Sequence, residues 1–143
     1  MASEPGRTVL VCEDDPAMIR IFQFLLRQQG IRNVLTTSSG SAVLSIVQRE
    51  KPDLLLLDLM LPDKDGLTVI NELKQDPICR VIPVIVVSGR EAQDQVHQAM
   101  VAGAIDYVIK PFEPMELGAR IRGFLDSLSA SQIPPSAGLG GAI

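Results

Sequence analysis

The chain has 143 residues, of which 46% are hydrophobic and 21% are charged, with no repeat and no long block of charge. This length fits one ordinary domain, which buries enough surface to fold without disulfides or a structural metal. A formal net charge of −4 and a pI near 4.9 argue against a surface that binds duplex nucleic acid. We find no apolar stretch of membrane-spanning length, no signal-peptide core and no spaced cysteine motif, so we expect a cytoplasmic protein.

The first part of the chain alternates extended and helical patterns. The β-branched run at residues 8–12 predicts a strand. Asp15 followed by Pro16 is typical of a helix start, with aspartate as the N-cap and proline at the first helical position. A short strand is predicted at residues 34–37, and a helix around residues 43–47.

The second part begins with an unbroken apolar run at residues 54–57, and a similar run follows at residues 84–87. Such runs are typical of central parallel strands that are covered on both faces. The remaining predicted elements are a helix over 67–75, a helix over 91–102, a strand over 107–109 and a helix that begins near Pro114.

Five strands alternating with five helices predict an α/β fold, in which a parallel sheet carries helices on both faces. The predicted domain occupies residues 8–128. We expect residues 1–7 to be an N-terminal tail. Residues 129–143 contain several prolines and glycines and no charge, which is typical of a flexible C-terminal tail or linker.

Side chains that can bind a metal or take part in a reaction follow four of the predicted strands. Glu13 and Asp14 follow the first strand, Asp58 the third, Ser88 the fourth and Lys110 the fifth. Because the ends of parallel strands share one edge of a sheet, we expect these side chains to lie at that edge.

Carboxylates at this edge would repel one another if the first and third strands are neighbours, and a hard divalent cation would relieve the repulsion. Mg²⁺ fits, because it usually takes one or two protein carboxylates and keeps water or phosphate oxygens as its other ligands. Lys110 would add a cation, and Ser88 a hydroxyl that can donate to a phosphoryl oxygen. A carboxylate can form an aspartyl phosphate, and Asp58 is the best candidate because it ends a central strand.

Each of these residues also has a purely structural interpretation. Asp14 and Asp58 could be solvated loop carboxylates, Lys110 a surface lysine and Ser88 a turn residue. The combination at one edge is more specific than any single member.

Four segments, VLVCEDDP, LLLLDLMLPDKDG, PVIVVSG and GAIDYVIKPF, occur in this order and span most of residues 8–126. Together they resemble the receiver domains of two-component response regulators. The resemblance implies a flavodoxin-like, doubly wound sheet of five parallel strands in the order 2-1-3-4-5, with five helices. It also implies a phosphorylation-dependent signalling switch, rather than an enzyme, that uses Mg²⁺ to accept a phosphoryl group from the phosphohistidine of a sensor histidine kinase or a phosphotransfer protein. The switch would then act on a downstream effector or output domain whose identity the sequence does not specify.

The resemblance assigns the acceptor and the metal ligands residue by residue. It implies that Asp58 is the phospho-acceptor and a Mg²⁺ ligand. Asp14 would be the direct carboxylate ligand, Glu13 would act mostly through water, and the backbone carbonyl of Met60 would complete the protein ligands.

The resemblance also assigns the switch. Ser88 would move toward the phosphoryl group and Tyr107 would turn inward with it, although Tyr107 could equally be an ordinary half-buried strand residue. Lys110 would contact the phosphoryl group and would precede Pro111 through a cis peptide bond. The signalling surface would lie within Glu91–Leu125.

In this family, the positions of Met60 and Arg90 influence how easily water reaches the acyl phosphate. Because Met60 is apolar, we expect a phosphoryl group that is not among the most short-lived.

Three other functions remain open at this stage. One is a phosphate-independent interaction module with a receiver fold, since fold does not determine function. A flavodoxin-like cofactor binder would need a phosphate-cradling loop, whereas the loop after the first strand is CEDDPAM. A phosphohydrolase with an aspartate nucleophile would normally place that residue after the first strand, with a second acid two residues on. His97 falls within a predicted helix, where we expect a surface position.

Overall fold

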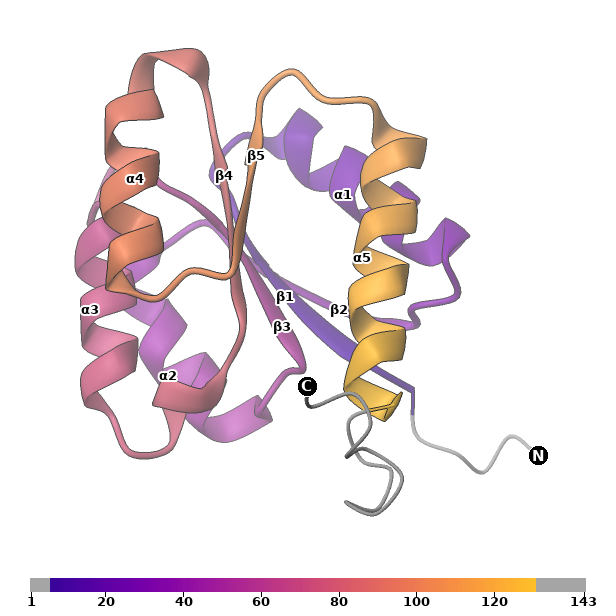
Figure 1. Ribbon diagram of the computed structural model, residues 1–143, viewed down its shortest axis with the longest axis horizontal. Helices are drawn as coiled ribbons and strands as arrows, with labels where there is room; N and C mark the ends of the chain where they lie inside the picture. Colours follow the sequence, from indigo (N-terminus) through magenta and orange to yellow (C-terminus); the bar gives the residue numbers. More distant parts are fainter. Residues whose placement is uncertain (1–5, 131–143) are drawn as a thin grey trace, which may run out of the picture.

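The structure, a computed structural model, describes residues 6–130. Within these residues, strands and helices alternate along the chain (Figure 1). The elements are β1 (Thr8–Cys12), α1 (Pro16–Gln28), β2 (Asn33–Thr37), α2 (Gly40–Glu50), β3 (Leu54–Asp58), α3 (Gly66–Gln75), the 3₁₀ helix η1 (Cys79–Val81), β4 (Val84–Ser88), the 3₁₀ helix η2 (Arg90–Ala92), α4 (Gln93–Ala102), β5 (Asp106–Ile109) and α5 (Pro114–Ala130).

The five strands form one parallel sheet in the order β2-β1-β3-β4-β5. Helices α1 and α5 cover one face of the sheet, and α2, α3 and α4 cover the other (Figure 1). This arrangement confirms the predicted doubly wound fold and its strand order. The order reverses between β1 and β3, and in such sheets ligands bind beyond the carboxyl ends of the strands at this switch point.

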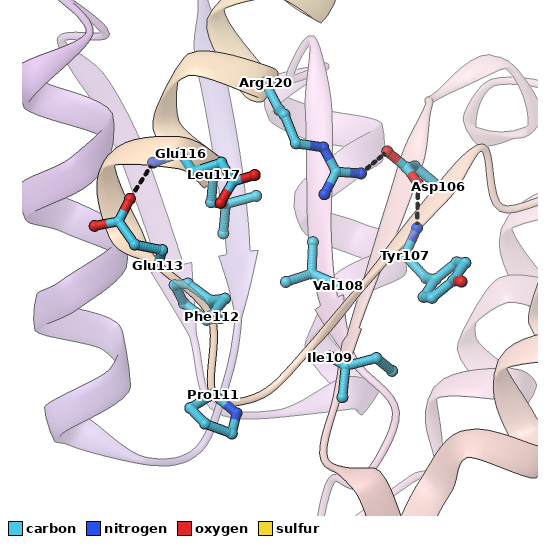
Figure 2. A pocket seen from close by; sticks show the side chains of 10 residues that line it. All are labelled: Asp106, Tyr107, Val108, Ile109, Pro111, Phe112, Glu113, Glu116, Leu117 and Arg120. Carbon is cyan, nitrogen blue, oxygen red and sulfur yellow. Dashed lines mark hydrogen bonds and ion pairs between the residues drawn. The ribbon is translucent and has the colours of Figure 1, made fainter.

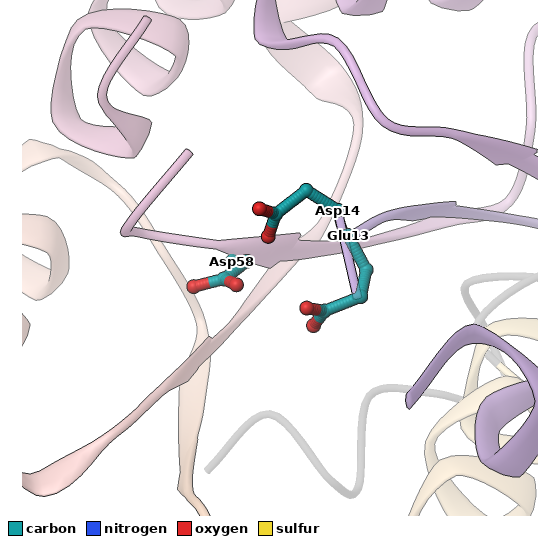
Figure 3. Close-up of side chains that lie close together, drawn as sticks. All are labelled: Glu13, Asp14 and Asp58. Atoms are coloured by element: carbon teal, nitrogen blue, oxygen red, sulfur yellow. The ribbon is translucent and has the colours of Figure 1, made fainter. Parts of the chain in front are cut away.

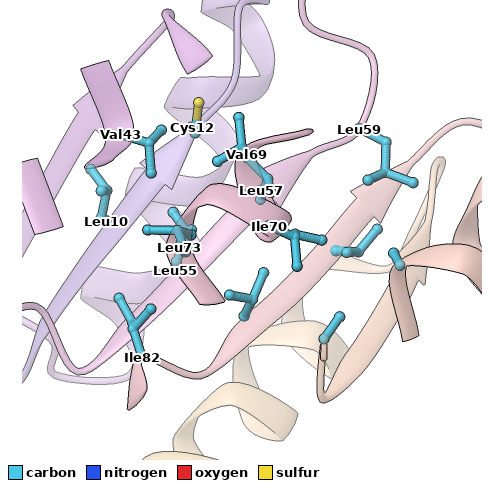
Figure 4. Close-up of a cluster of buried hydrophobic side chains, with 14 of the residues drawn as sticks. Leu10, Cys12, Val43, Leu55, Leu57, Leu59, Val69, Ile70, Leu73 and Ile82 are labelled. Carbon is cyan, nitrogen blue, oxygen red and sulfur yellow. The ribbon is translucent and has the colours of Figure 1, made fainter. Parts of the chain in front are cut away.

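Two hydrophobic cores lie on the two faces of the sheet. Alternate residues of β3 divide between them, with Leu55 and Leu57 in the core beneath α2, α3 and α4 (Figure 4) and Leu54 and Leu56 in the core beneath α1 and α5. All four are fully buried, and each contributes roughly 1.5–3 kcal/mol of burial free energy. The packed strands therefore hold the carboxyl end of β3 rigidly.

The structure adjusts several predicted boundaries and adds short elements. Asp15 caps α1 as predicted, accepting a hydrogen bond from the Ala17 amide at 3.0 Å. The predicted helix at residues 91–102 instead begins with η2, and α4 follows from Gln93. Within the described part of the chain, no helix is long and apolar enough to cross a membrane. Most of the two predicted tails lies outside the described residues.

Gly66, the first residue of α3, leaves no room for a side chain. Its amide donates to the Leu59 carbonyl at 3.0 Å, and an added Cβ would lie 2.7 Å from Leu59 Cα and 3.0 Å from the Asp58 carbonyl oxygen. Since these contacts are with backbone, Gly66→Ala forces the loop after β3 to shift. We expect the free energy of unfolding to fall by about 1–3 kcal/mol, measured by urea denaturation.

Gly123→Ala is the matched control, because a Cβ there has nothing within 4 Å and the residue lies exposed on α5. We expect this variant to gain up to about 1 kcal/mol of helix propensity. Equal denaturation midpoints for the two variants would contradict the steric argument.

Candidate functional site

Three carboxylates meet at the carboxyl edge of the sheet, beside the switch point. Glu13 and Asp14 follow β1, and Asp58 is the last residue of the neighbouring strand β3 (Figure 3). One carboxylate oxygen from each lies within 4.8 Å of the other two. Glu13 and Asp58 are only 1% and 4% exposed, whereas Asp14 faces solvent. The predicted cluster is thus a real one, with one accessible carboxylate and two buried ones.

Lys110 neutralises part of this charge. Its ammonium lies 2.9 Å from Glu13 Oε1 and 3.2 Å from Asp58 Oδ2. Its own amide donates to the Ser88 carbonyl at 2.7 Å, and the bond to Pro111 is cis. The end of β5 therefore holds the ammonium against both buried carboxylates.

Burial and charge act in opposite directions on these groups. Burial raises the pKa of Glu13, although the hydrogen bond from Lys110 opposes this shift. Burial alone would lower the pKa of Lys110, but its hydrogen bond to Glu13 and the charge of Asp58 raise it. Lys110 is therefore firmly cationic at neutral pH.

The backbone also holds the Asp58 carboxylate. Asp58 Oδ1 accepts a hydrogen bond from the Met60 amide at 2.9 Å. The Leu59 amide donates to the Val87 carbonyl at 3.2 Å, which fastens the same turn to β4. The Asp58 side chain is thereby fixed from two sides, by the turn that follows it and by Lys110.

Ser88 and Tyr107 occupy contrasting environments. The Ser88 hydroxyl is fully buried and has no hydrogen-bond partner among residues 6–130. Tyr107 is 45% exposed, and its ring projects from β5 away from the cavity of about 470 Å³ between β5 and α5 (Figure 2), toward a hollow that it lines with Val96 and His97 of α4. An ion pair between Asp106 and Arg120 spans one side of this cavity. His97 is exposed on α4, as predicted.

One residue of the loop that follows Asp58 is not recognisable as a structural partner from the sequence alone. The Asp63 carboxylate, in the loop between β3 and α3, accepts hydrogen bonds from Ser39 and from the first amides of α2. The serines before α2 are recognisable as capping residues in the sequence. Their partner lies 24 positions further along the chain, which no local pattern indicates.

The residues present suit a Mg²⁺ ion. Three carboxyl groups face one ammonium group, and within residues 6–130 no side-chain hydrogen bond reaches the Asp14 carboxylate. Hard oxygen donors with uncompensated negative charge are the environment that Mg²⁺ prefers.

The sequence model of the response regulator receiver domain matches residues 9–122. This chain belongs to that family. The match covers all five strands except Thr8, together with the first half of α5, and it brings the candidate site within the receiver domain. The flavodoxin-like cofactor binder and the phosphohydrolase are therefore set aside.

Curated relatives include the transcriptional regulatory protein KdpE of Staphylococcus aureus, 42% identical over 80% of this chain and 48% of its own length. The phosphate regulon regulatory protein PhoB of Escherichia coli is 37% identical over 87% of this chain and 54% of its own length. The receiver domain described here thus spans about half the length of the curated relatives it matches.

Solved receiver domains are similar in structure. A response regulator from Chloroflexus aurantiacus superimposes with a TM-score of 0.78 at 30% identity, covering 85% of this chain and 99% of its own. The receiver domain of the sensor histidine kinase PA1611 from Pseudomonas aeruginosa gives a TM-score of 0.73 at 30% identity, covering 82% of this chain and 95% of its own. That domain carries a magnesium ion in its active-site cleft.

Proposed function

We propose that this receiver domain accepts a phosphoryl group on Asp58 and thereby switches a surface that a downstream partner recognises. The donor is the phosphohistidine of a sensor histidine kinase or phosphotransfer protein, in the cytoplasm. The observation that carries this proposal is the Asp58 carboxylate, 4% exposed at the switch edge, with Lys110 on one side and Glu13 and Asp14 on the other. The phosphate-independent interaction module is less well supported, because all of these groups are present together.

In the transfer, a carboxylate oxygen of Asp58 attacks the phosphorus of the donor. The new O–P bond forms as the P–N bond to the donor imidazole breaks, and the imidazole leaves with the electron pair of that bond. Lys110 stabilises the charge on the phosphoryl oxygens as a compact cation. The protein thus assists its own phosphorylation without being an enzyme that acts on other substrates.

Asp14, Asp58 and the Met60 carbonyl would hold Mg²⁺, which when bound neutralises charge on the transferring group. Both oxygens of Glu13 already accept hydrogen bonds, one from Lys110 and the other from the Asp15 amide. This arrangement favours Glu13 acting through water rather than as a direct ligand.

The buried Ser88 hydroxyl supports the proposed switch. A buried hydroxyl without a partner is costly, and a phosphoryl oxygen nearby would accept its hydrogen bond. Movement of Ser88 would leave space beneath β5 that Tyr107, now half exposed, could fill. The change would then reach α4, β5 and α5.

Intact-mass spectrometry after incubation with acetyl phosphate tests the proposal. With Mg²⁺ we expect a single phosphoryl adduct that peptide mapping places on Asp58, and without Mg²⁺ we expect none. An unmodified protein under both conditions would favour the phosphate-independent interaction module instead.

Met60 is expected to shield the phosphoryl group from water. Its side chain is apolar, 47% exposed, and lines a cavity that Asp14 also lines. Met60→Ala should shorten the lifetime of the phosphorylated form several-fold, followed by loss of the adduct with time, because more water reaches the acyl phosphate. Met115→Ala, at a methionine 51% exposed on α5, should leave the lifetime unchanged. A strongly slowed decay in Met60→Ala would refute the shielding role.

A further inference from the structure

We propose that Asp63 is a positioning residue that clamps the loop between β3 and α3 to the start of α2, and so sets the Mg²⁺ affinity of the site. This inference rests on the proposed function. It concerns a side chain that neither contacts Asp58 directly nor belongs to the ligand set assigned above. The loop in question, residues 59–65, carries the Met60 carbonyl.

Both carboxylate oxygens of Asp63 are engaged by the start of α2. Oδ1 accepts from the Gly40 amide at 3.0 Å, while Oδ2 accepts from the Ser39 hydroxyl at 2.8 Å and from the Ser41 amide at 3.1 Å. These hydrogen bonds hold the pKa of Asp63 well below its usual range, so the carboxylate is charged at neutral pH. Asp63 therefore replaces the cap that Ser39 does not supply to its own helix.

The clamp extends to the loop that carries the other proposed ligands. Thr37 links the loop after β1 to the start of α2. Its carbonyl accepts a hydrogen bond from the Glu13 amide at 3.0 Å, and its hydroxyl accepts one from the Ser39 amide at 3.2 Å. A continuous set of hydrogen bonds thus runs from the loop after β1, through the end of β2, to Asp63 in the loop after β3. This hydrogen-bond network therefore supports both loops that carry proposed ligands, Asp14 after β1 and the Met60 carbonyl after β3.

This hydrogen-bond network lies on the opposite side of the site from Lys110. In the sheet, β2 lies beyond β1, while Lys110 follows β5 at the other edge. Lys110 neutralises the buried carboxylates directly, whereas the Asp63 clamp holds the backbone of the loops after β1 and β3. The two supports are therefore separable by mutation.

Packing at Gly40 shows how closely the two segments fit. A Cβ at Gly40 would lie 3.0 Å from the Lys64 carbonyl oxygen and 3.1 Å from Leu61 Cδ1. The start of α2 is thus in direct contact with the loop after β3. Without the Asp63 hydrogen bonds, this contact would keep the segments close but would leave the loop free to shift along α2.

Asp63→Ala should weaken Mg²⁺ binding by on the order of tenfold, as loss of an outer support of a metal site commonly does. Isothermal titration with MgCl₂ measures this directly. Asp63→Asn keeps one acceptor oxygen and should give an intermediate affinity. Labelling by acetyl phosphate should slow at low Mg²⁺ concentration and recover toward the wild-type rate when Mg²⁺ is saturating.

Asp76→Ala is the matched control. Asp76 makes a similar clamp at the far ends of α2 and α3, accepting from Cys79 and Ile78 amides at 2.9 and 3.0 Å and from Gln48 Nε2 at 3.0 Å. Its loss should lower the denaturation midpoint as the loss of Asp63 does, but leave the Mg²⁺ affinity unchanged.

Amide hydrogen exchange in the metal-free protein gives a second measurement. In Asp63→Ala we expect faster exchange at the Met60 and Gly66 amides, and in Asp76→Ala we expect wild-type exchange at both. Equal Mg²⁺ affinities in the two variants would overturn the inference. So would a wild-type protein that binds no Mg²⁺. A wild type that binds Mg²⁺ but takes no phosphoryl group would overturn the proposed function alone, and the affinities would still decide the role of Asp63.

Discussion

Asp58→Asn is expected to abolish the phosphoryl adduct that acetyl phosphate and Mg²⁺ produce in the wild type. The amide nitrogen cannot replace a carboxylate oxygen as the attacking group, while the amide oxygen can still accept from the Met60 amide. The variant also removes one of three clustered carboxylates, so we expect its thermal stability without Mg²⁺ to equal or exceed that of the wild type. Intact-mass spectrometry and thermal denaturation measure the two effects.

Asp53→Asn provides the control for this experiment. Asp53 lies just before β3, at the opposite end of the same strand, and accepts from the Thr8 amide at 2.8 Å. The same change of charge there should leave labelling intact. An adduct of wild-type yield in Asp58→Asn would place the acceptor elsewhere, and loss of the adduct in both variants would point to a general electrostatic effect.

Lys110→Met is expected to destabilise the metal-free protein by about 3 kcal/mol at neutral pH, measured by urea denaturation with a chelator. Removing one partner of a buried ion pair leaves its counterion without compensation, and here the side chains of Glu13 and Asp58 are only 2% and 5% exposed. The variant should also be labelled far more slowly by acetyl phosphate, because no cation from β5 remains to stabilise the transferring group.

The pH dependence of this loss follows from Glu13. Burial already raises the pKa of Glu13 in the folded protein, and in the variant Lys110 is no longer there to oppose this rise. A Glu13 pKa that is higher in the folded than in the unfolded protein means that protonation favours the folded state. The loss of stability in Lys110→Met should therefore be small below the unfolded pKa of about 4.3 and should grow as pH rises through the folded pKa. A deficit that is constant across this range would show that packing, rather than charge, is lost.

Lys64→Met controls for the loss of a lysine. Lys64 pairs with Glu72 at 2.9 Å, but both side chains are substantially exposed to solvent, at 27% and 38%. Pairs of this kind contribute up to about 1 kcal/mol. Lys64→Met should therefore cost much less than Lys110→Met and should leave labelling at saturating Mg²⁺ unchanged.

The amino-acid sequence by itself determined the alternation of strands and helices, because these depend on local periodicity and on breakers such as Pro16. It also placed Glu13, Asp14, Asp58, Ser88 and Lys110 at one edge, since residues that follow parallel strands necessarily share that edge. The strand order came from the family resemblance, and the sheet confirmed it.

Only the tertiary structure decided how these groups are supported. The Ser88 hydroxyl is buried without a hydrogen-bond partner in the described part of the chain, and Asp63 caps a helix that begins 23 residues before it. Neither feature follows from the neighbouring residues in the sequence, because each depends on how loops distant in sequence pack once the sheet has formed. A side chain's type and its position after a strand suffice to indicate chemistry, whereas its burial and its hydrogen-bond partners are properties of the assembled fold.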